Sequence, residues 1–223
     1  MGWGVFLHEY LKISTGPLVI FSAGGHGRVV AEVAEAMGYV VRGFIDRARH
    51  EDERIDGRPV MFHTLAELAS SRSFEGVGVF VADSRNAERC ELIEAALALG
   101  FSVPTLVHPS AIVSPTCSIG DGSVVMAGAV IHANAKVGRG CILNTACSID
   151  HDNVLEAGVQ IGPGAHVAGG VHFGPHATVG TGASLIPGVR IGERAVVGAG
   201  AVVIANVPAG VTVVGNPARS LEV

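Results

Sequence analysis

A six-residue period runs through the second half of this sequence. Stepping by six from Val113 meets sixteen bulky apolar residues with no break in phase. These are Val113, Ile119, Val125, Ile131, Val137, Leu143, Ile149, Leu155, Ile161, Val167, Phe173, Val179, Leu185, Ile191, Val197 and Val203. A fixed short period indicates a solenoid, and a period of six excludes an α-helix, which turns every ~3.6 residues. We therefore expect a parallel β-helix.

A second series, of mainly small residues, lies two positions before the first. Residues i and i+2 of a strand face the same way, so both series should point into the core. Twelve of the sixteen members are Ala, Ser or Cys, and they include Cys117, Cys141 and Cys147, which we predict to be packing residues. Seven of the sixteen residues after the large position are Gly, and we expect these to supply the corner conformations that other residues resist. The seven are Gly120, Gly138, Gly162, Gly174, Gly180, Gly192 and Gly198.

Composition narrows the classes of function. The chain has 223 residues, of which 48% are hydrophobic and 16% charged, enough for a sizeable core. The net charge is −5 without a basic run, so a nucleic-acid partner is not expected. No apolar run reaches the length of a membrane span, and residues 1–15 lack signal-peptide organisation, which favours a cytoplasmic protein without membrane insertion. The four cysteines form no CxxC pair, so no metal site is expected.

The first half has a different organisation. Strands are predicted over residues 18–21, 40–45, 77–82 and 102–107, with helices over 28–37 and 87–99 between them. Such alternation predicts a small parallel sheet with Rossmann-like connections. We expect an N-terminal extension over residues 1–16, this α/β domain over 17–108 and the β-helix over 109–223.

A glycine-rich turn, Ser22 to Gly27, joins the first strand to the first helix. Such a turn offers backbone N–H groups and the positive end of a helix to phosphates. An acidic residue after the next strand, here Asp46, can bond a ribose or a base edge. A dinucleotide is one possible ligand, although Ser22 replaces the first glycine of the usual G-x-G-x-x-G pattern. A structural turn without a ligand is the alternative.

The two halves together resemble the sugar O- and N-acetyltransferases of the NeuD- and PglD-like group. The resemblance covers residues 17–219, and the motifs that carry it are Ala23-Gly24-Gly25-His26-Gly27, Phe44-Ile45-Asp46, His108-Pro109-Ser110-Ala111, Asn144-Thr145, Ile149-Asp150-His151-Asp152, Ala168-Gly169-Gly170 and Val214-Gly215-Asn216-Pro217-Ala218. It implies a Rossmann-like domain that binds a nucleotide-linked sugar. It also implies a left-handed β-helix of hexapeptide repeats, with 18 residues per coil, that binds acetyl-CoA between the subunits of a homotrimer.

The Asp150-His151-Asp152 sequence is the candidate catalytic centre. Histidine suits a general base because its pKa is near neutrality, and an adjacent carboxylate can raise its basicity. With 18 residues per coil, His151 lies at a corner between Ala133 and Gly169, which leaves room for a substrate. Gly169 or Gly170 could donate an N–H to the oxyanion.

The resemblance assigns roles to further residues. It makes His151 the general base and Asp152 its acidic partner, with Asn144 on the preceding face as a secondary candidate, and we prefer Asp152 to Asp150. It carries nucleotide-sugar contacts over to Gly24, Gly25, His26, Asp46, Arg47 and Ala82. Acetyl-CoA contacts carry over to Gln160, Gly169, Thr181 and Ala199, and Gln160 departs from the histidine that the family often has there.

We therefore expect an acetyl-CoA-dependent N-acetyltransferase of polysaccharide biosynthesis. Its acceptor would be the amine of a UDP-, GDP- or dTDP-linked 4-amino-4,6-dideoxy sugar, acetylated by direct transfer. O-acetylation of sialic acid or a related sugar hydroxyl is the alternative within the class. A non-catalytic trimeric scaffold and a dinucleotide-binding regulator are alternatives of other classes.

Overall fold

The computed structural model describes residues 16–71 and 74–221 of the chain. Contacts divide these residues into two compact units, with the boundary between Leu106 and Val107. The predicted extension over 1–16 lies outside the described residues except for Gly16. Among the described helices, none has the length and apolarity to cross a membrane.

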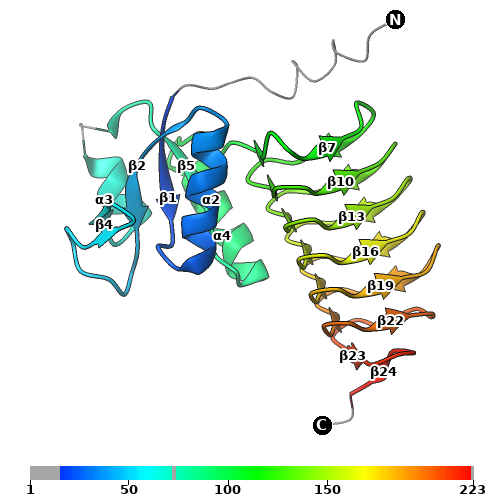
Figure 1. Cartoon of the computed structure of the whole chain (residues 1–223). Coiled ribbons are helices and arrows are strands. Elements are labelled where there is room, and N and C mark those ends of the chain that lie inside the picture. The colour runs from blue at the N-terminus through cyan, green and yellow to red at the C-terminus, as the bar shows by residue number, and fades with distance from the viewer. Residues whose placement is uncertain (1–15, 72–73, 222–223) are drawn as a thin grey trace, which may run out of the picture. The chain divides into compact units, whose positions relative to one another are not determined.

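The first unit contains a five-stranded sheet (Figure 1). The strands follow the order β3 (Arg54–Ile55), β4 (Arg58–Phe62), β2 (Val40–Ile45), β1 (Pro17–Phe21) and β5 (Gly78–Val81). The helices are α2 (Gly25–Ala36), α3 (Leu65–Ser70) and α4 (Asn86–Ala98). All pairings are parallel except that of β3 with β4. The predicted Rossmann-like arrangement is confirmed, whereas β3, β4 and α3 were not predicted.

The prediction that residues 102–107 form a strand of this unit's sheet is wrong. Ser102 makes only an isolated bridge to Gly78, and Pro104 follows, which has no backbone N–H to donate to a sheet. Leu106 and Val107 instead form β6, which pairs in the second unit's sheets. The apolar run over residues 102–107 therefore does contain a strand, β6, but this strand belongs to a sheet of the second unit.

The second unit is a left-handed parallel β-helix with three sheets that form the faces of a prism. The β13 face consists of β7 (Ile112–Val113), β10 (Val130–Ile131), β13 (Ser148–Ile149), β16 (His166–Val167), β19 (Ser184–Leu185) and β22 (Val202–Val203). The β14 face consists of β8 (Ser118–Ile119), β11 (Lys136–Val137), β14 (Val154–Leu155), β17 (His172–Phe173) and β20 (Arg190–Ile191). The β15 face consists of β6 (Leu106–Val107), β9 (Val124–Val125), β12 (Ile142–Leu143), β15 (Gln160–Ile161), β18 (Thr178–Val179), β21 (Val196–Val197), β23 (Thr212–Val214) and β24 (Arg219–Ser220).

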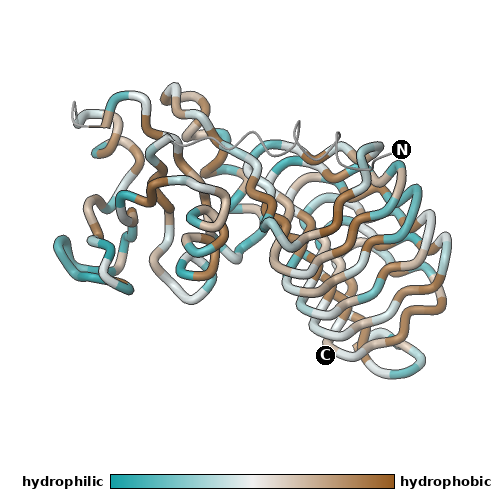
Figure 2. The backbone as a smooth tube through the Cα atoms, turned by 45° about the horizontal axis from the view of Figure 1, so that its top comes forward, coloured by the Kyte–Doolittle hydropathy of each residue, from teal (hydrophilic) through white to brown (hydrophobic). Residues whose placement is uncertain are grey.

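The register of the prism confirms the predicted coil of 18 residues. Val113 pairs with Ile131 and Ile131 pairs with Ile149, and the same offset repeats on the other faces. Figure 1 shows these strands stacked from β7 to β22, and Figure 2 shows apolar strand segments alternating with more polar corners. Both predicted inward series are packed in one continuous core.

The three cysteines of the small series lie inside the prism, as predicted. Cys117, Cys141 and Cys147 are buried in the prism. Burial raises the pKa of the Cys147 thiol to about 12, so this group stays protonated at neutral pH. These cysteines therefore act as small packing residues.

The prediction about corner glycines is wrong in its mechanism. The glycines after the large positions have no left-handed backbone; a Cβ on Gly138, for example, would lie 2.9 Å from the backbone N of Ala157 in the next coil. The left-handed conformation occurs two residues later, at every corner from Gly122 to Gly200. Five of those corners carry a side chain: Asn134, Ala146, Asp152, His176 and Arg194. Close packing of coils, rather than φ, therefore selects glycine at the first position.

Candidate active site

His151 lies at the corner between β13 and β14. We use the name His151 corner for this corner in all coils of the prism. Nδ1 of His151 is 2.8 Å from Oδ2 of Asp152, and the His151 backbone N–H donates to Oδ1 of Asp150 at 2.8 Å. The side chains of His151 and Asp152 are 61% and 59% exposed. The two carboxylates thus have different tasks, since Asp152 binds the imidazole and Asp150 binds the backbone.

The contact with Asp152 determines the protonation behaviour of the imidazole. The hydrogen bond to Asp152, followed by the charge of Asp150, raises the pKa of His151 above its ordinary value. In turn, the bonds from His151 and then Asn134 lower the pKa of Asp152. When Nδ1 of a neutral imidazole carries the proton that binds Asp152, Nε2 presents a lone pair. His151 is then an exposed base with a fixed tautomer.

Gly169 lies one coil beyond His151 and next to the imidazole. A Cβ built on Gly169 would be 2.6 Å from Cε1 and 2.7 Å from Nε2 of His151. The N–H of Gly170 donates to the carbonyl of His151 at 2.9 Å, so this group is already used within the corner. Of the two glycines considered as oxyanion donors, Gly169 is therefore the remaining candidate.

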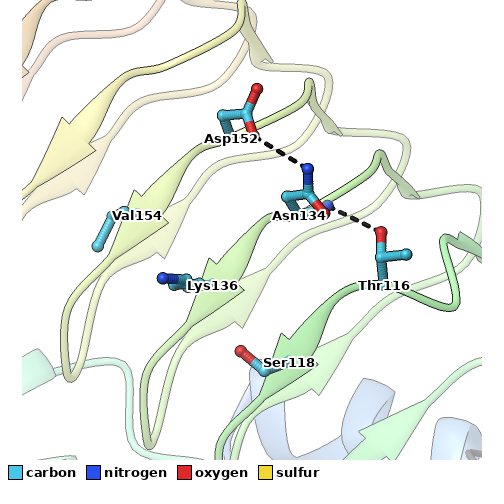
Figure 3. Close-up of a pocket in the computed structure, with 6 residues that line it drawn as sticks. All are labelled: Thr116, Ser118, Asn134, Lys136, Asp152 and Val154. Carbon is cyan, nitrogen blue, oxygen red and sulfur yellow. Dashed lines mark hydrogen bonds between the residues drawn. The ribbon is translucent and has the colours of Figure 1, made fainter.

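A column of polar side chains supports Asp152 from the N-terminal side (Figure 3). Nδ2 of Asn134 donates to Oδ1 of Asp152 at 3.2 Å, and the backbone N–H of Asn134 donates to Oγ1 of Thr116 at 2.9 Å. These residues occupy the same position in three successive coils. Together with three residues of the β14 face, they line a groove of about 490 Å³; the three are Ser118, Lys136 and Val154. The polar column was not predicted, because only the stacking of coils brings it together.

The other candidate residues of the prism lie at a different corner. Thr181 and Ala199 follow β18 and β21, at the corner between the β15 and β13 faces, which we call the Thr181 corner. Asn144 follows β12 at the same corner, where its Oδ1 accepts the N–H of Thr145 at 2.7 Å. Gln160 begins β15 on the adjoining face. Within one chain, the β13 face therefore separates these residues from His151 and Gly169.

The glycine-rich turn of the first unit lies at the carboxyl ends of three adjacent strands. β2, β1 and β5 are neighbours, and they are followed by Asp46, Ser22 and Ala82 respectively. A Cβ on Gly27 would lie 1.9 Å from the carbonyl O of Ser22, so this position requires glycine. Around the exposed Gly25, by contrast, no atom of the described residues lies within 4 Å of the corresponding Cβ. One glycine therefore closes the turn while the other keeps its outer surface open.

The six predicted nucleotide-sugar contacts come together around this turn. Oδ2 of Asp46 accepts the N–H of Ala23 at 2.8 Å, and Oδ1 accepts the N–H of Ala48 at 2.9 Å. The guanidinium of Arg47 lies 5.4 Å from the ring centroid of Phe21. Asp46 thus holds the turn in shape, a role that the sequence pattern did not indicate.

His26 is a neutral group at the start of α2. Burial, followed by the charge of Arg89, lowers its pKa to about 4. Its Nε2 is buried without a hydrogen-bond partner among the described residues. The guanidinium of Arg89 is itself buried and donates to the carbonyl of Asp83 at 2.8 Å. His26 is therefore uncharged at neutral pH and has an unused nitrogen beside the turn.

Metal chemistry has no candidate ligand set in the part of the chain that the structure describes. No group of three or more His, Cys, Asp or Glu side chains there could hold an ion.

Comparisons with known proteins agree with both units. Residues 17–96 match the PglD N-terminal domain. A GDP-perosamine N-acetyltransferase of Escherichia coli O157:H7 is 35% identical over 147 residues, which cover 64% of this chain and 66% of that protein, just under two thirds of its length.

Two solved structures match almost the whole chain. One is the acetyltransferase domain of PglB from Neisseria gonorrhoeae in complex with acetyl coenzyme A, with 44% identity, a TM-score of 0.86 and coverage of 92% of this chain and 98% of that one. The other is PerB from Caulobacter crescentus in complex with CoA and GDP-perosamine, with 40% identity, a TM-score of 0.87 and coverage of 93% and 98%.

Both matches cover more than nine tenths of this chain, so they include both units in the same order along the chain. The described sites lie where each unit has its strongest sequence motifs, the glycine-rich turn and the Asp150-His151-Asp152 corner. This chain belongs to the PglD-like family of hexapeptide-repeat sugar acetyltransferases.

Proposed function

We propose that this chain transfers the acetyl group of acetyl-CoA to the amino group of a nucleotide-linked 4-amino-4,6-dideoxy sugar. The observation that carries the proposal is the His151–Asp152 pair at an exposed corner, where Nε2 of His151 lies beside Gly169 and has no hydrogen-bond partner among the described residues. The relatives that bind CoA together with GDP-perosamine support this class of donor and acceptor.

The reaction is a direct transfer. The amine nitrogen attacks the thioester carbonyl and forms the C–N bond, while Nε2 of His151 takes the amine proton. The tetrahedral intermediate collapses with cleavage of the C–S bond, and the proton passes from the imidazolium to the departing thiolate. Asp152 stabilises the imidazolium through Nδ1, and the N–H of Gly169 stabilises the oxyanion. The buried cysteines are unsuited to a covalent mechanism because they lie inside the prism.

A homotrimer with active sites between subunits is the second part of the proposal. His151 and Gly169 lie at one corner of the prism, whereas Thr181, Ala199 and Asn144 lie at another. Within one chain the β13 face lies between the two sets, which favours a site in which two chains contribute to one acetyl-CoA. Packing the His151 corner of one subunit against the Thr181 corner of the next would complete the site, and closed cyclic symmetry then repeats it. Gln160 would contribute from the adjoining face.

The first unit would hold the nucleotide part of the acceptor. The accessible surface at Gly24 and Gly25 offers backbone N–H groups at the start of α2 to a diphosphate. Nε2 of His26 is buried and lacks a partner in the described chain, which makes it a candidate group for the ligand. Arg47 and Ala82 border the same edge of the sheet. We place the reaction in the cytoplasm, where free thiols such as those of this chain persist.

A thiol-release assay tests the proposed function. Purified protein is supplied with acetyl-CoA and, separately, with GDP-perosamine and with UDP- and dTDP-linked 4-amino sugars. We expect CoA release with one of them at a rate of about 1 s⁻¹ or more. A His151→Asn variant should lose about 10²–10⁴-fold in kcat because the general base is absent.

The side chain of His151 is exposed, so this variant should keep its thermal midpoint and its binding of CoA. A His132→Asn variant is the matched control, since His132 lies at the same corner one coil before Asp150, without a carboxylate partner at its imidazole among the described contacts. Near-normal turnover by His151→Asn, or no turnover of any sugar by the wild-type protein, would refute the proposal. Sedimentation equilibrium that reports a monomer under assay conditions would refute its trimeric part.

A further inference from the structure

Asn153 is a buried amide in a series of small, mostly apolar residues. It occupies the inward position of the His151 corner and has no exposed surface. A buried amide is costly unless its polar atoms are bonded. Its Nδ2 donates to the carbonyls of Asp150 at 2.7 Å and Ala168 at 3.0 Å, and its Oδ1 accepts the N–H of Val171 at 3.0 Å. The amide is therefore fully engaged with the backbone.

Two of these bonds are a general device of the prism. Ser123, in the same inward series, donates to the carbonyl of Gly138 at 2.8 Å and accepts the N–H of Cys141 at 2.9 Å. Asn153 makes the equivalent pair with Ala168 and Val171, which links one coil to the next. The bond to Asp150 is additional, because it lies within the corner that carries His151.

Nδ2 of Asn153 also lies 3.5 Å from the carbonyl O of His151. The two closer carbonyls belong to the peptide groups that carry the proposed base and the proposed oxyanion donor. One is the Asp150–His151 peptide and the other is the Ala168–Gly169 peptide. In a trans peptide the C=O and N–H point in opposite directions. With the Ala168 carbonyl fixed inward, the N–H of Gly169 points outward, and a bonded carbonyl also makes that N–H a better donor. One amide thus fixes the base and the oxyanion donor relative to each other.

We propose that Asn153 is a positioning residue that holds the His151 and Gly169 peptide groups in their catalytic arrangement. This inference rests on the proposed function. It does not make Asn153 a catalytic residue, because the side chain is buried and reaches the site only through the backbone.

An Asn153→Ser variant separates positioning from stability. A serine there can make the coil-linking pair that Ser123 makes, but its short side chain does not reach the carbonyl of Asp150 as well. We expect kcat to fall about tenfold or more while the KM for acetyl-CoA stays within about twofold, because misplacement affects the chemical step. The pKa of His151, followed by NMR of the imidazole and assigned with His151→Asn, should change as the corner relaxes.

Ser123→Ala is the matched control, since it removes the same coil-linking pair at a corner without candidate residues. It should lower the thermal midpoint and leave kcat and the His151 pKa unchanged. Asn153→Cys serves as the second variant if the serine variant does not fold, because three cysteines already occupy this series.

Variants at Asn153 that keep both kcat and the His151 pKa, with only a loss of thermal stability, would overturn the inference. Failure of the proposed function has a different signature, because the wild-type protein would then turn over none of the sugars. The NMR comparison still decides the role of Asn153 in that case.

Discussion

The imidazole of His151 lies directly beside the α-carbon of Gly169, one coil further along the prism. The same corner position in the other fifteen repeats carries a side chain, from Ala and Thr to Pro, Glu and Arg. The backbone there accepts L side chains, and Gly169 does not have a left-handed φ. Glycine at this one position is therefore explained by the imidazole and not by the chain conformation.

A Gly169→Ala substitution should displace the imidazole. The added Cβ would lie 2.6 Å from Cε1, and an exposed side chain can yield by rotating away. We expect the thermal stability to change by less than about 0.5 kcal/mol, as for other surface substitutions. Rotation breaks the bond to Asp152, so the pKa of His151 should fall and kcat should drop about tenfold or more.

Proton NMR of the His151 imidazole measures this shift without any substrate. Ala133→Gly is the control, because it changes the neighbour on the opposite side of His151 without adding atoms. An unchanged His151 pKa in Gly169→Ala would show that the two residues do not constrain each other.

The pH dependence of turnover should follow the His151–Asp152 bond. A general base must be unprotonated, so a raised pKa places the acidic limb of kcat/KM above the ordinary histidine value of about 6.5. Asp152→Asn removes the carboxylate, which is the main cause of the raised pKa, and the limb should move to lower pH. The maximal rate should fall, because the imidazolium loses its stabilising charge.

Asparagine is the suitable replacement because Asp152 has a left-handed φ of 58°, which Asn tolerates better than Ala. Asp150→Asn is the comparison, since the carboxylate of Asp150 bonds the backbone and contributes only through its charge. A limb that stays in place in Asp152→Asn would assign the titration to the acceptor amine rather than to His151.

The period of six placed His151 at a corner, because steric alternation along strands determines which residues face inward. The position of that corner between Ala133 and Gly169 followed from the coil of 18 residues that the family resemblance implied. The period could not reveal the roles of Asn134 and Asn153, which depend on bonds between residues 15 to 18 positions apart. The period also could not distinguish corner glycines that have a left-handed φ from those that lie close to the backbone of the next coil. Gly138 is selected by the backbone of the next coil, and that contact exists only once the coils are stacked.

The hydrogen bond from Asn134 to Asp152 should have a measurable, smaller effect on catalysis. Removing it raises the pKa of Asp152 and leaves the carboxylate freer to rotate away from His151. We expect kcat to fall several-fold in Asn134→Gly, less than in Asp152→Asn, since the neutral donor contributes about 1 kcal/mol. Glycine is preferred to alanine here because Asn134 has a φ of 61°. A loss as large as that of Asp152→Asn would mean that Asn134 contacts the substrate directly.

The two kinds of corner glycine predict opposite responses to substitution. A Cβ on Gly162 would lie 2.7 Å from the carbonyl O of Val179, and the backbone of a packed coil cannot yield as a surface side chain can. Gly162→Ala should therefore destabilise the protein by about 1–3 kcal/mol. Gly164 has a φ of 61°, and a Cβ there would have no described atom within 4 Å. Asn134 already occupies the same left-handed position at another corner of the prism. Gly164→Asn should stay within about 0.5 kcal/mol, although it adds the larger side chain. Urea denaturation compares the two, and equal losses would show that backbone conformation, rather than the closeness of the coils, selects both glycines.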